Sequence, residues 1–154
     1  MYTVDLTGKN ALIFGVANHR SIAWAIAQAL YGAGARVALT YQTDRLKEGV
    51  EGLAKEIGDA PLFLCDVSND GEVEELYKKV GETMGALSTV VHSIAFAQRD
   101  DLGGDFSKTE REGFRVALDV SAFSLIPVVR YAAPLMTEGG TVIAMTFLAA
   151  EKVF

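Results

Sequence analysis

The stretch ALIFGVANHRSIAW, residues Ala11–Trp24, decides the fold of this chain. An apolar run ends at Gly15, a polar loop follows, and Ser21 opens a second apolar period. This order predicts a buried strand, a tight turn and a helix. A helix N-terminus presents unpaired N–H groups and the positive end of its dipole, which suits a phosphate. The stretch therefore indicates a dinucleotide site, although the GxGxxG fingerprint is absent and an ordinary βα connection gives the same pattern.

The composition fits one domain that spans residues 1–154. Of the 154 residues, 50% are hydrophobic, which is enough for a core, and the net charge is −6. An acidic chain disfavours nucleic acid and anionic membrane as partners, because both attract basic surfaces. The single cysteine, Cys65, excludes an internal disulfide, and neither a signal peptide nor an uninterrupted membrane-spanning apolar run is seen. We expect a cytoplasmic protein.

Five short apolar segments alternate with four helical patterns along the chain. The expected strands are Asn10–Phe14, Arg36–Tyr41, Pro61–Cys65, Thr89–Ile94 and Thr141–Phe147. The expected helices are Ser21–Tyr31, Asp44–Ile57, Asp70–Met84 and Thr109–Met136, the last with a kink or break at Pro127. Ser68 and Asn69 are cap candidates for the third helix, and Ser107 and Glu110 have capping-box spacing before the fourth.

This alternation predicts an α/β fold, a Rossmann-type doubly wound parallel sheet with strand order 3-2-1-4-5. No helical pattern follows the fifth strand to cover that edge. Because an uncovered apolar edge strand is a liability, we expect the fold to be truncated after strand 5.

Ligands of such sheets bind at the carboxyl ends of the strands, where the strand order reverses. Here that point lies between strands 1 and 4, and four strand ends converge on one groove. Gly15 would let the backbone approach a cofactor, and Ser21 with the Ile22 amide would donate to pyrophosphate. The other expected contacts are Gln42 to the adenosine ribose, Asp66 to the adenine amine, with Val67 beside it, and Ser93 and Ile94 along the nicotinamide ribose. An alternative role for Asp66 is the N-cap of the third helix.

Five strings in colinear order carry a resemblance that covers essentially the whole chain. They are GVANHRSIAWAIAQAL (Gly15–Leu30), ALTYQTDRL (Ala38–Leu46), LCDVSND (Leu64–Asp70), VVHSIAFA (Val90–Ala97) and EGFRVALDVSAFS (Glu112–Ser124). They closely resemble the NADH-dependent enoyl-acyl-carrier-protein reductases of bacterial type II fatty acid synthesis, in the short-chain dehydrogenase/reductase superfamily. The Gly-x5-Ser-Ile-Ala and His-Ser-Ile motifs distinguish this family from ordinary short-chain dehydrogenases.

The resemblance implies a set of site residues. Gly15, Ser21, Ile22, Gln42, Asp66, Val67 and Ile94 match NAD-contacting positions, and Val120 matches a residue that packs near adenine. Ala97 matches a substrate contact, and Phe147 replaces a tyrosine that lines the acyl pocket in many members. Ala95 stands where many members have glycine, which brings a methyl group near the acyl site.

The resemblance also implies a catalytic tyrosine, followed seven positions later by a lysine, on the helix after strand 5. Only Tyr2 has a lysine at that spacing, Lys9, and this pair lies before strand 1. We therefore expect no catalytic residue in this chain and place the pair beyond Phe154. The activity implied for the whole protein is reduction of trans-2-enoyl-acyl-carrier-protein with NADH, by a homotetramer.

Other functions remain as alternatives. A non-catalytic NAD-binding regulatory module would share these motifs. A phospho-acceptor receiver domain would need an acidic pair after strand 1, where Val16–His19 has none. No cluster has metal-ligand spacing. We expect His92 to be a packed core residue and Cys65 to be a small buried hydrophobe.

Overall fold

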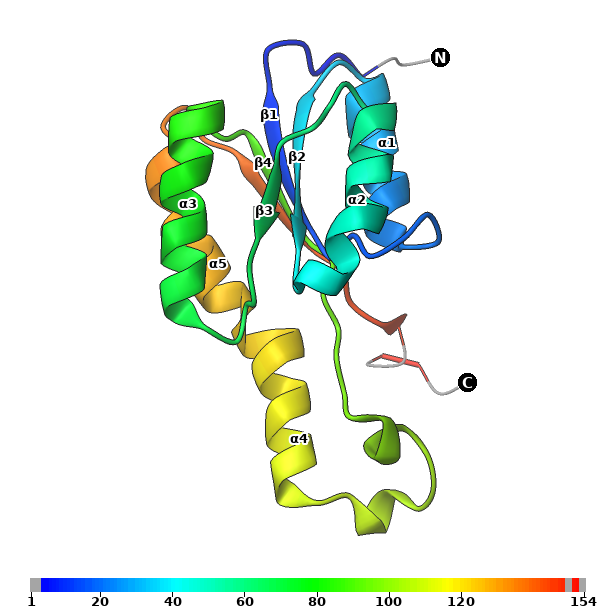
Figure 1. Cartoon of the computed structure of the whole chain (residues 1–154). Helices are drawn as coiled ribbons and strands as arrows, with labels where there is room; N and C mark the ends of the chain where they lie inside the picture. The colour runs from blue at the N-terminus through cyan, green and yellow to red at the C-terminus, as the bar shows by residue number, and fades with distance from the viewer. Residues whose placement is uncertain (1–3, 149–150, 153–154) are drawn as a thin grey trace.

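A computed structural model describes residues 4–148 and 151–152. Five parallel strands form one sheet in the order β3-β2-β1-β4-β5, which confirms the predicted topology (Figure 1). The strands are β1 (Asn10–Phe14), β2 (Arg36–Tyr41), β3 (Leu62–Leu64), β4 (Thr89–His92) and β5 (Thr141–Ala144). The first two have the expected bounds, whereas the other three are shorter than expected.

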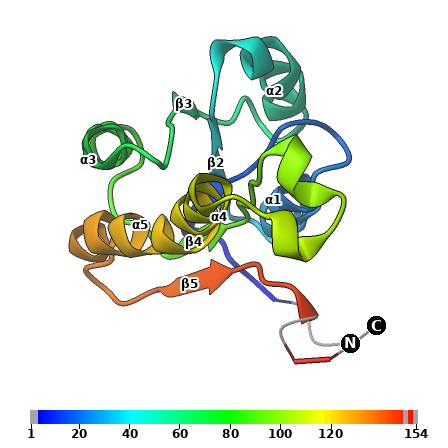
Figure 2. The same cartoon turned by 90° about the horizontal axis from the view of Figure 1, so that it is seen from below.

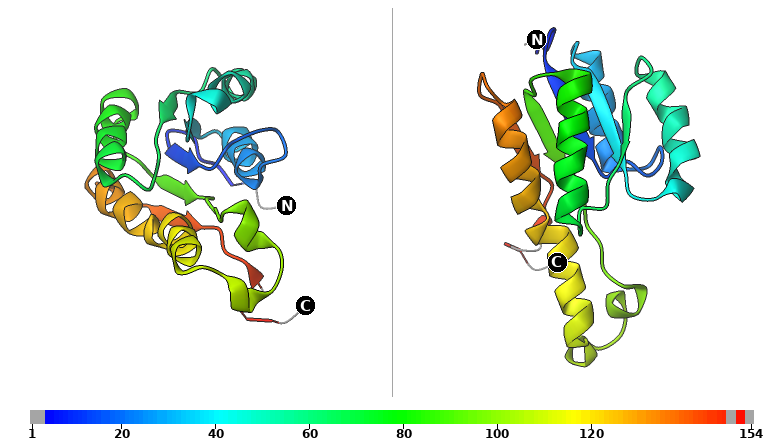
Figure 3. Two further views of the ribbon diagram at one scale, coloured as in Figure 1. Left: turned by 60° about the horizontal axis from the view of Figure 1, so that its bottom comes forward. Right: turned by 60° about the vertical axis from the view of Figure 1, so that its left-hand side comes forward.

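Four of the five α-helices cover the two faces of this sheet in pairs. The five helices are α1 (Ile22–Gly32), α2 (Asp44–Glu56), α3 (Asp70–Met84), α4 (Arg111–Leu118) and α5 (Leu125–Ala132). Figure 3 shows α1 and α2 on one side of the sheet and α3 and α5 on the other. Two apolar clusters fill the layers, one around Ile13 and Trp24 and the other around Phe14 and Leu76. Burial of β1 on both faces explains its continuous apolar sequence.

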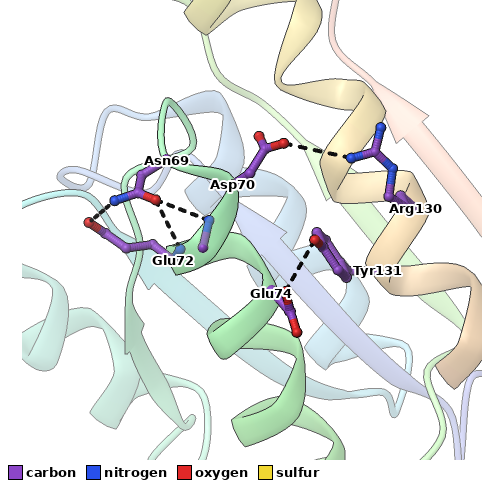
Figure 4. A network of polar contacts seen from close by, with 7 residues as sticks. Asn69, Asp70, Glu72, Glu74, Arg130 and Tyr131 are labelled. Carbon is purple, nitrogen blue, oxygen red and sulfur yellow. Dashed lines mark hydrogen bonds and ion pairs between the residues drawn. The ribbon is translucent and has the colours of Figure 1, made fainter.

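The N-terminus of α3 is closed by a network that also reaches α5 (Figure 4). Asn69 is the N-cap, and its side chain accepts from the N–H groups of Gly71 and Glu72. Between the helices, the Tyr131 hydroxyl donates to Glu74 at 3.3 Å, and Arg130 pairs with Asp70 at 3.6 Å. These contacts hold α5 against α3. Of the two cap candidates, Asn69 is therefore the cap and Ser68 is not.

The expected fourth helix, residues 109–136, is divided into shorter pieces. A π-helical turn, η3 (Asp119–Phe123), separates α4 from α5, and a 3-10 turn, η4 (Ala133–Leu135), follows. Pro127 lies in the first turn of α5 and has no N–H to donate to the carbonyl of Phe123. The predicted break is thus present, but it lies one turn before the proline.

The capping box expected at Ser107 and Glu110 is wrong. Ser107 lies inside a separate 3-10 turn, η2 (Phe106–Lys108), and Glu110 is itself the N-cap residue, without a side-chain cap bond. Together with η1 (Arg99–Leu102), η2 and α4 extend beyond the carboxyl edge of the sheet (Figure 1).

Among the described residues, one helical segment, Arg111–Leu135, is long and apolar enough to span a membrane. Core helices of globular proteins can have the same length and apolar composition. In this segment Val128 and Ala132 are fully buried in the protein's own core.

Candidate nucleotide-binding site

A cavity of about 190 Å³ opens at the carboxyl edge of the sheet, where the strand order reverses. Figure 2 looks onto this edge from below. Three of the residues that line it follow β1: Gly15, Val16 and Ala17. Thr40 and Tyr41 end β2, Gln42 follows that strand, and Leu46 belongs to α2. The others are Cys65 and Val67 after β3, Ser93, Ile94, Ala95 and Phe96 after β4, and Val120 in η3. Six expected site residues therefore share one cavity: Gly15, Gln42, Val67, Ser93, Ile94 and Val120.

Gly15 allows the ends of β1 and β4 to approach each other. Its φ of +95° is one that residues with side chains rarely adopt. A Cβ at this position would lie 1.9 Å from the carbonyl oxygen of Ser93. Only glycine fits here, and both Gly15 and Ser93 line the cavity.

Ser21 closes the loop between β1 and α1. Its hydroxyl oxygen accepts from the N–H groups of Ala17 and Asn18, both at 3.1 Å. These two bonds use its acceptor capacity and leave its own proton free to donate. Ile22 is the first residue of α1, and its side chain is 63% exposed. Ser21 and Ile22 stand at the helix N-terminus, outside the residues that line the cavity.

Asp66 lies on the loop after β3, beside Gln42. The Gln42 amide donates to its Oδ2 at 3.4 Å, while Ser68 donates to its Oδ1 through both N–H (3.0 Å) and hydroxyl (2.8 Å). Burial acts to raise the pKa of Asp66, but the bonds from Ser68 and Gln42 outweigh it and hold the pKa below its usual value. The carboxylate is thus ionised at neutral pH and can accept further bonds. Because Asn69 caps α3, the alternative N-cap role for Asp66 is wrong.

Two residues that the sequence argument missed hold this loop. Glu72 accepts from the Asp66 N–H at 2.9 Å and from the Asn69 amide at 3.2 Å. Ser68 supplies the two bonds to Asp66 described above. The spacing of Asn69 and Glu72, three residues apart at a helix start, resembles a capping box and could have indicated Glu72.

The end of β4 is held by the π-helical turn. The Ser121 hydroxyl bonds both backbone groups of Phe96, and the Ser124 hydroxyl lies 2.8 Å from Nε2 of His92. His92 is 1% exposed, and burial lowers its pKa, so the expectation of a packed core histidine is confirmed. Cys65 is also buried, which raises the pKa of its thiol to about 12 and fits a small hydrophobe.

The two expected substrate contacts lie outside the cavity. Ala97 is half-buried just beyond Phe96, and Phe147 follows β5 with its side chain 75% exposed. Their roles stay predictions. Within the part of the chain that the structure describes, no group of three or more His, Cys, Asp or Glu side chains could hold a metal ion.

A parallel sheet with strand order 3-2-1-4-5 and a cavity at its switch point defines a Rossmann-type fold. The family model of enoyl-(acyl carrier protein) reductases matches residues 15–154. This chain belongs to that family.

Individual relatives agree with this assignment. The NADH-type enoyl-(acyl carrier protein) reductase of Nostoc is 45% identical over 148 residues, which are 94% of this chain and 57% of that protein. The crystal structure of the NADH enzyme from Aquifex aeolicus superposes with a TM-score of 0.93 at 43% identity, covering 97% of this chain and 59% of that one. The chain thus spans somewhat more than half the length of these relatives.

The relatives differ in the form of the cofactor. The Bacillus cereus reductase was crystallised with NADP⁺ and indole naphthyridinone. It superposes with a TM-score of 0.93 at 43% identity, over 97% of this chain and 60% of that one. A relative from Staphylococcus aureus is named as an NADPH-type enoyl-(acyl carrier protein) reductase. It is 41% identical over 96% of this chain and 59% of its own length. A nicotinamide cofactor is common to these relatives, whereas its phosphorylation varies.

Proposed function

We propose that the cleft binds NADH and that the whole protein reduces trans-2-enoyl thioesters carried on acyl carrier protein. The observation that carries the proposal is the close approach of Gly15 and Ser93, which both line a cavity at the sheet switch point. In a member of this reductase family, that cradle suits a flat, extended dinucleotide. The acyl-carrier-protein substrate comes from the family names alone.

Each expected cofactor-binding residue has a physical role in this proposal. The N-terminus of α1, with the Ser21 hydroxyl and the Ile22 N–H, would bind the pyrophosphate. Asp66 would accept the adenine amine, Val67 and Val120 would pack beside the ring, and Gln42 would contact the ribose. Ser93 and Ile94 would run along the nicotinamide ribose. When bound, NADH supplies the hydride, and the protein supplies position and electrostatics.

Ala97 and Phe147 are our proposed substrate contacts. Both lie on segments that leave the carboxyl edge of the sheet, after β4 and β5. An enoyl thioester develops negative charge on its carbonyl oxygen during reduction, and the tyrosine of the family motif would hydrogen-bond that oxygen. The 154-residue chain contains no such tyrosine followed by lysine at the expected place. Expressed alone, it should show no enoyl reduction above background.

We favour NADH over NADPH because of the residues that follow β2. Asp44 comes two positions after Gln42 and begins α2, with its side chain exposed. A carboxylate near the ribose repels a 2′-phosphate. In this proposal the protein is located in the cytoplasm and assembles as a homotetramer. The assembly is favoured because α4, η3 and α5 expose several large apolar side chains, among them Phe114, Leu118, Phe123 and Ile126.

The test is a spectrophotometric assay of the whole protein with an enoyl thioester and either reduced cofactor. The proposal expects turnover with a kcat/KM at least tenfold higher for NADH than for NADPH. Equal or better use of NADPH would overturn the cofactor choice. NADH binding without any turnover would instead support a non-catalytic regulatory module, and clear turnover by the 154-residue chain would refute the absence of catalytic residues.

A further inference from the structure

Phe96 lies on an irregular segment that has little other backbone support. Residues 93–98 form neither helix nor strand, although four of them line the cavity. Outside the regular ladders of the described chain, no backbone-to-backbone hydrogen bond involves residues 93–97. Phe96 is held instead by one side chain. The Ser121 hydroxyl accepts from its N–H and donates to its C=O, each at 3.0 Å.

A single hydroxyl that bonds both polar groups of one residue restricts the backbone of that residue. The Phe96 N–H and C=O flank its own φ and ψ, so a shared partner selects the few conformations that bring both groups to one atom. The segment from Ala95 to Ala97 takes its path from this residue. Ser121 therefore acts on the geometry of the cavity wall although it does not itself line the cavity.

The π-helical turn that carries Ser121 is anchored to the sheet at a second point. The Ser124 hydroxyl donates its proton to the Val120 carbonyl at 2.7 Å, so it accepts from Nε2–H of buried His92 at 2.8 Å. His92 is the last residue of β4. Ser121 and Ser124, three residues apart, thus hold the turn against β4 and against the segment that follows it. Val120 of the same turn lines the cavity.

From these contacts we infer that Ser121 is a positioning residue that sets the Phe96 backbone, and with it the cavity wall at Ala95 and Phe96 and the position of Ala97, the residue that follows. The inference rests on the proposed function, in which Ala97 contacts the enoyl substrate. If Ser121 had a purely structural role, its substitution would lower Tm and NADH affinity together with activity. Phe96 is 48% exposed, so water can replace the lost hydroxyl and folding should change little, whereas the wall loses its fixed path.

The decisive variants are Ser121→Ala, which removes both bonds, and Ser121→Thr, which keeps the hydroxyl. Ser107→Ala is the matched control, because Ser107 is exposed and makes no side-chain hydrogen bond within the described residues. In the whole protein, Ser121→Ala should lower kcat/KM for an enoyl thioester by about tenfold, as expected for two modest hydrogen bonds. Its NADH affinity should stay within about twofold and its Tm within about 2 °C, while Ser121→Thr recovers most of the activity.

Hydrogen exchange at the Phe96 amide tests the same contact without catalysis. Protection in the wild type should be lost in Ser121→Ala and kept in Ser107→Ala. Unchanged kcat/KM or unchanged protection in Ser121→Ala would overturn the inference, and so would parallel losses in Tm and NADH affinity. A wild type that binds NADH but reduces no enoyl thioester would refute the proposed function. In that case the exchange result alone decides whether Ser121 sets the Phe96 backbone.

Discussion

Replacing Asp66, on the loop between the cavity residues Cys65 and Val67, separates cofactor binding from helix capping. Its carboxylate accepts from Ser68 and Gln42, and the same oxygens are available to the exocyclic amine of adenine in our proposal. Removal of a charge-assisted hydrogen bond costs about 1–3 kcal/mol. Asp66→Ala should therefore weaken NADH binding by about 5- to 150-fold.

The effect on folding should be smaller, because the α3 cap is Asn69 and not Asp66. Asn69→Ala is the matched control. It removes the acceptor of the Gly71 and Glu72 N–H groups and should cost about 0.5–2 kcal/mol of unfolding free energy with little change in NADH affinity. Asp66→Asn keeps an acceptor for Ser68 but places an amide donor toward adenine, so it should weaken binding as alanine does.

Calorimetric titration of NADH into each folded variant, with denaturant unfolding alongside, measures both quantities. The expected pattern is a binding loss for the two Asp66 variants and a stability loss for Asn69→Ala. Unchanged NADH affinity in Asp66→Ala would refute the adenine role. A large stability loss with normal binding would mean that the contacts among Asp66, Ser68 and Glu72 serve folding alone.

The remaining predictions concern stability, pH and assembly. Gly15→Ala should lower the free energy of unfolding by about 2–6 kcal/mol, because its φ is strained for alanine and its Cβ would overlap Ser93. The control Gly52→Ala lies inside α2 with open space around it and should raise that free energy slightly. Equal effects of the two variants in chemical denaturation would contradict the close approach of Gly15 to Ser93. The pKa of Asp66 is lower in the folded than in the unfolded protein, so its contribution to stability is complete above the unfolded pKa of about 4 and is lost as pH falls through the folded pKa. The difference in unfolding free energy between the wild type and Asp66→Asn should therefore shrink below about pH 4. A difference that grows on acidification would refute this prediction. Light scattering of the whole protein should show an oligomer. Ile126→Asp should weaken that oligomer, because Ile126 is 52% exposed on α5. A wild type that is only monomeric at micromolar concentration would exclude the homotetramer.

The sequence predicted the central sheet well because burial dictates it. Most residues of β1 and β2 are apolar and buried, and a parallel strand covered on both faces requires that pattern. The later strands were predicted too long. Ile94 after β4 and Phe147 after β5 continue the apolar pattern outside the strands. Apolar residues occur both in a strand and in the segment that follows it, so the apolar pattern does not mark where the strand ends.

The site was predictable where a residue's role depends on its strand end, as for Gly15 and Gln42. It was not predictable where the role depends on a contact between distant segments. Ser121 bonds Phe96 across 25 residues of sequence, and only the π-helical turn brings the two together. Sequence alone also does not separate the buried from the exposed apolar residues of α5. Val128 is fully buried in the core beneath α5, whereas Ile126, two positions earlier, is 52% exposed.

The most direct test of the account is a crystal structure of the whole protein with NADH bound. We expect the pyrophosphate at the N-terminus of α1, against Ser21 and Ile22, and the adenine amine within hydrogen-bond distance of the Asp66 carboxylate. The cofactor should also pass Gly15 and Ser93, which line the cavity. A cofactor bound at any other place, or one with its adenine remote from Asp66, would contradict the central claim.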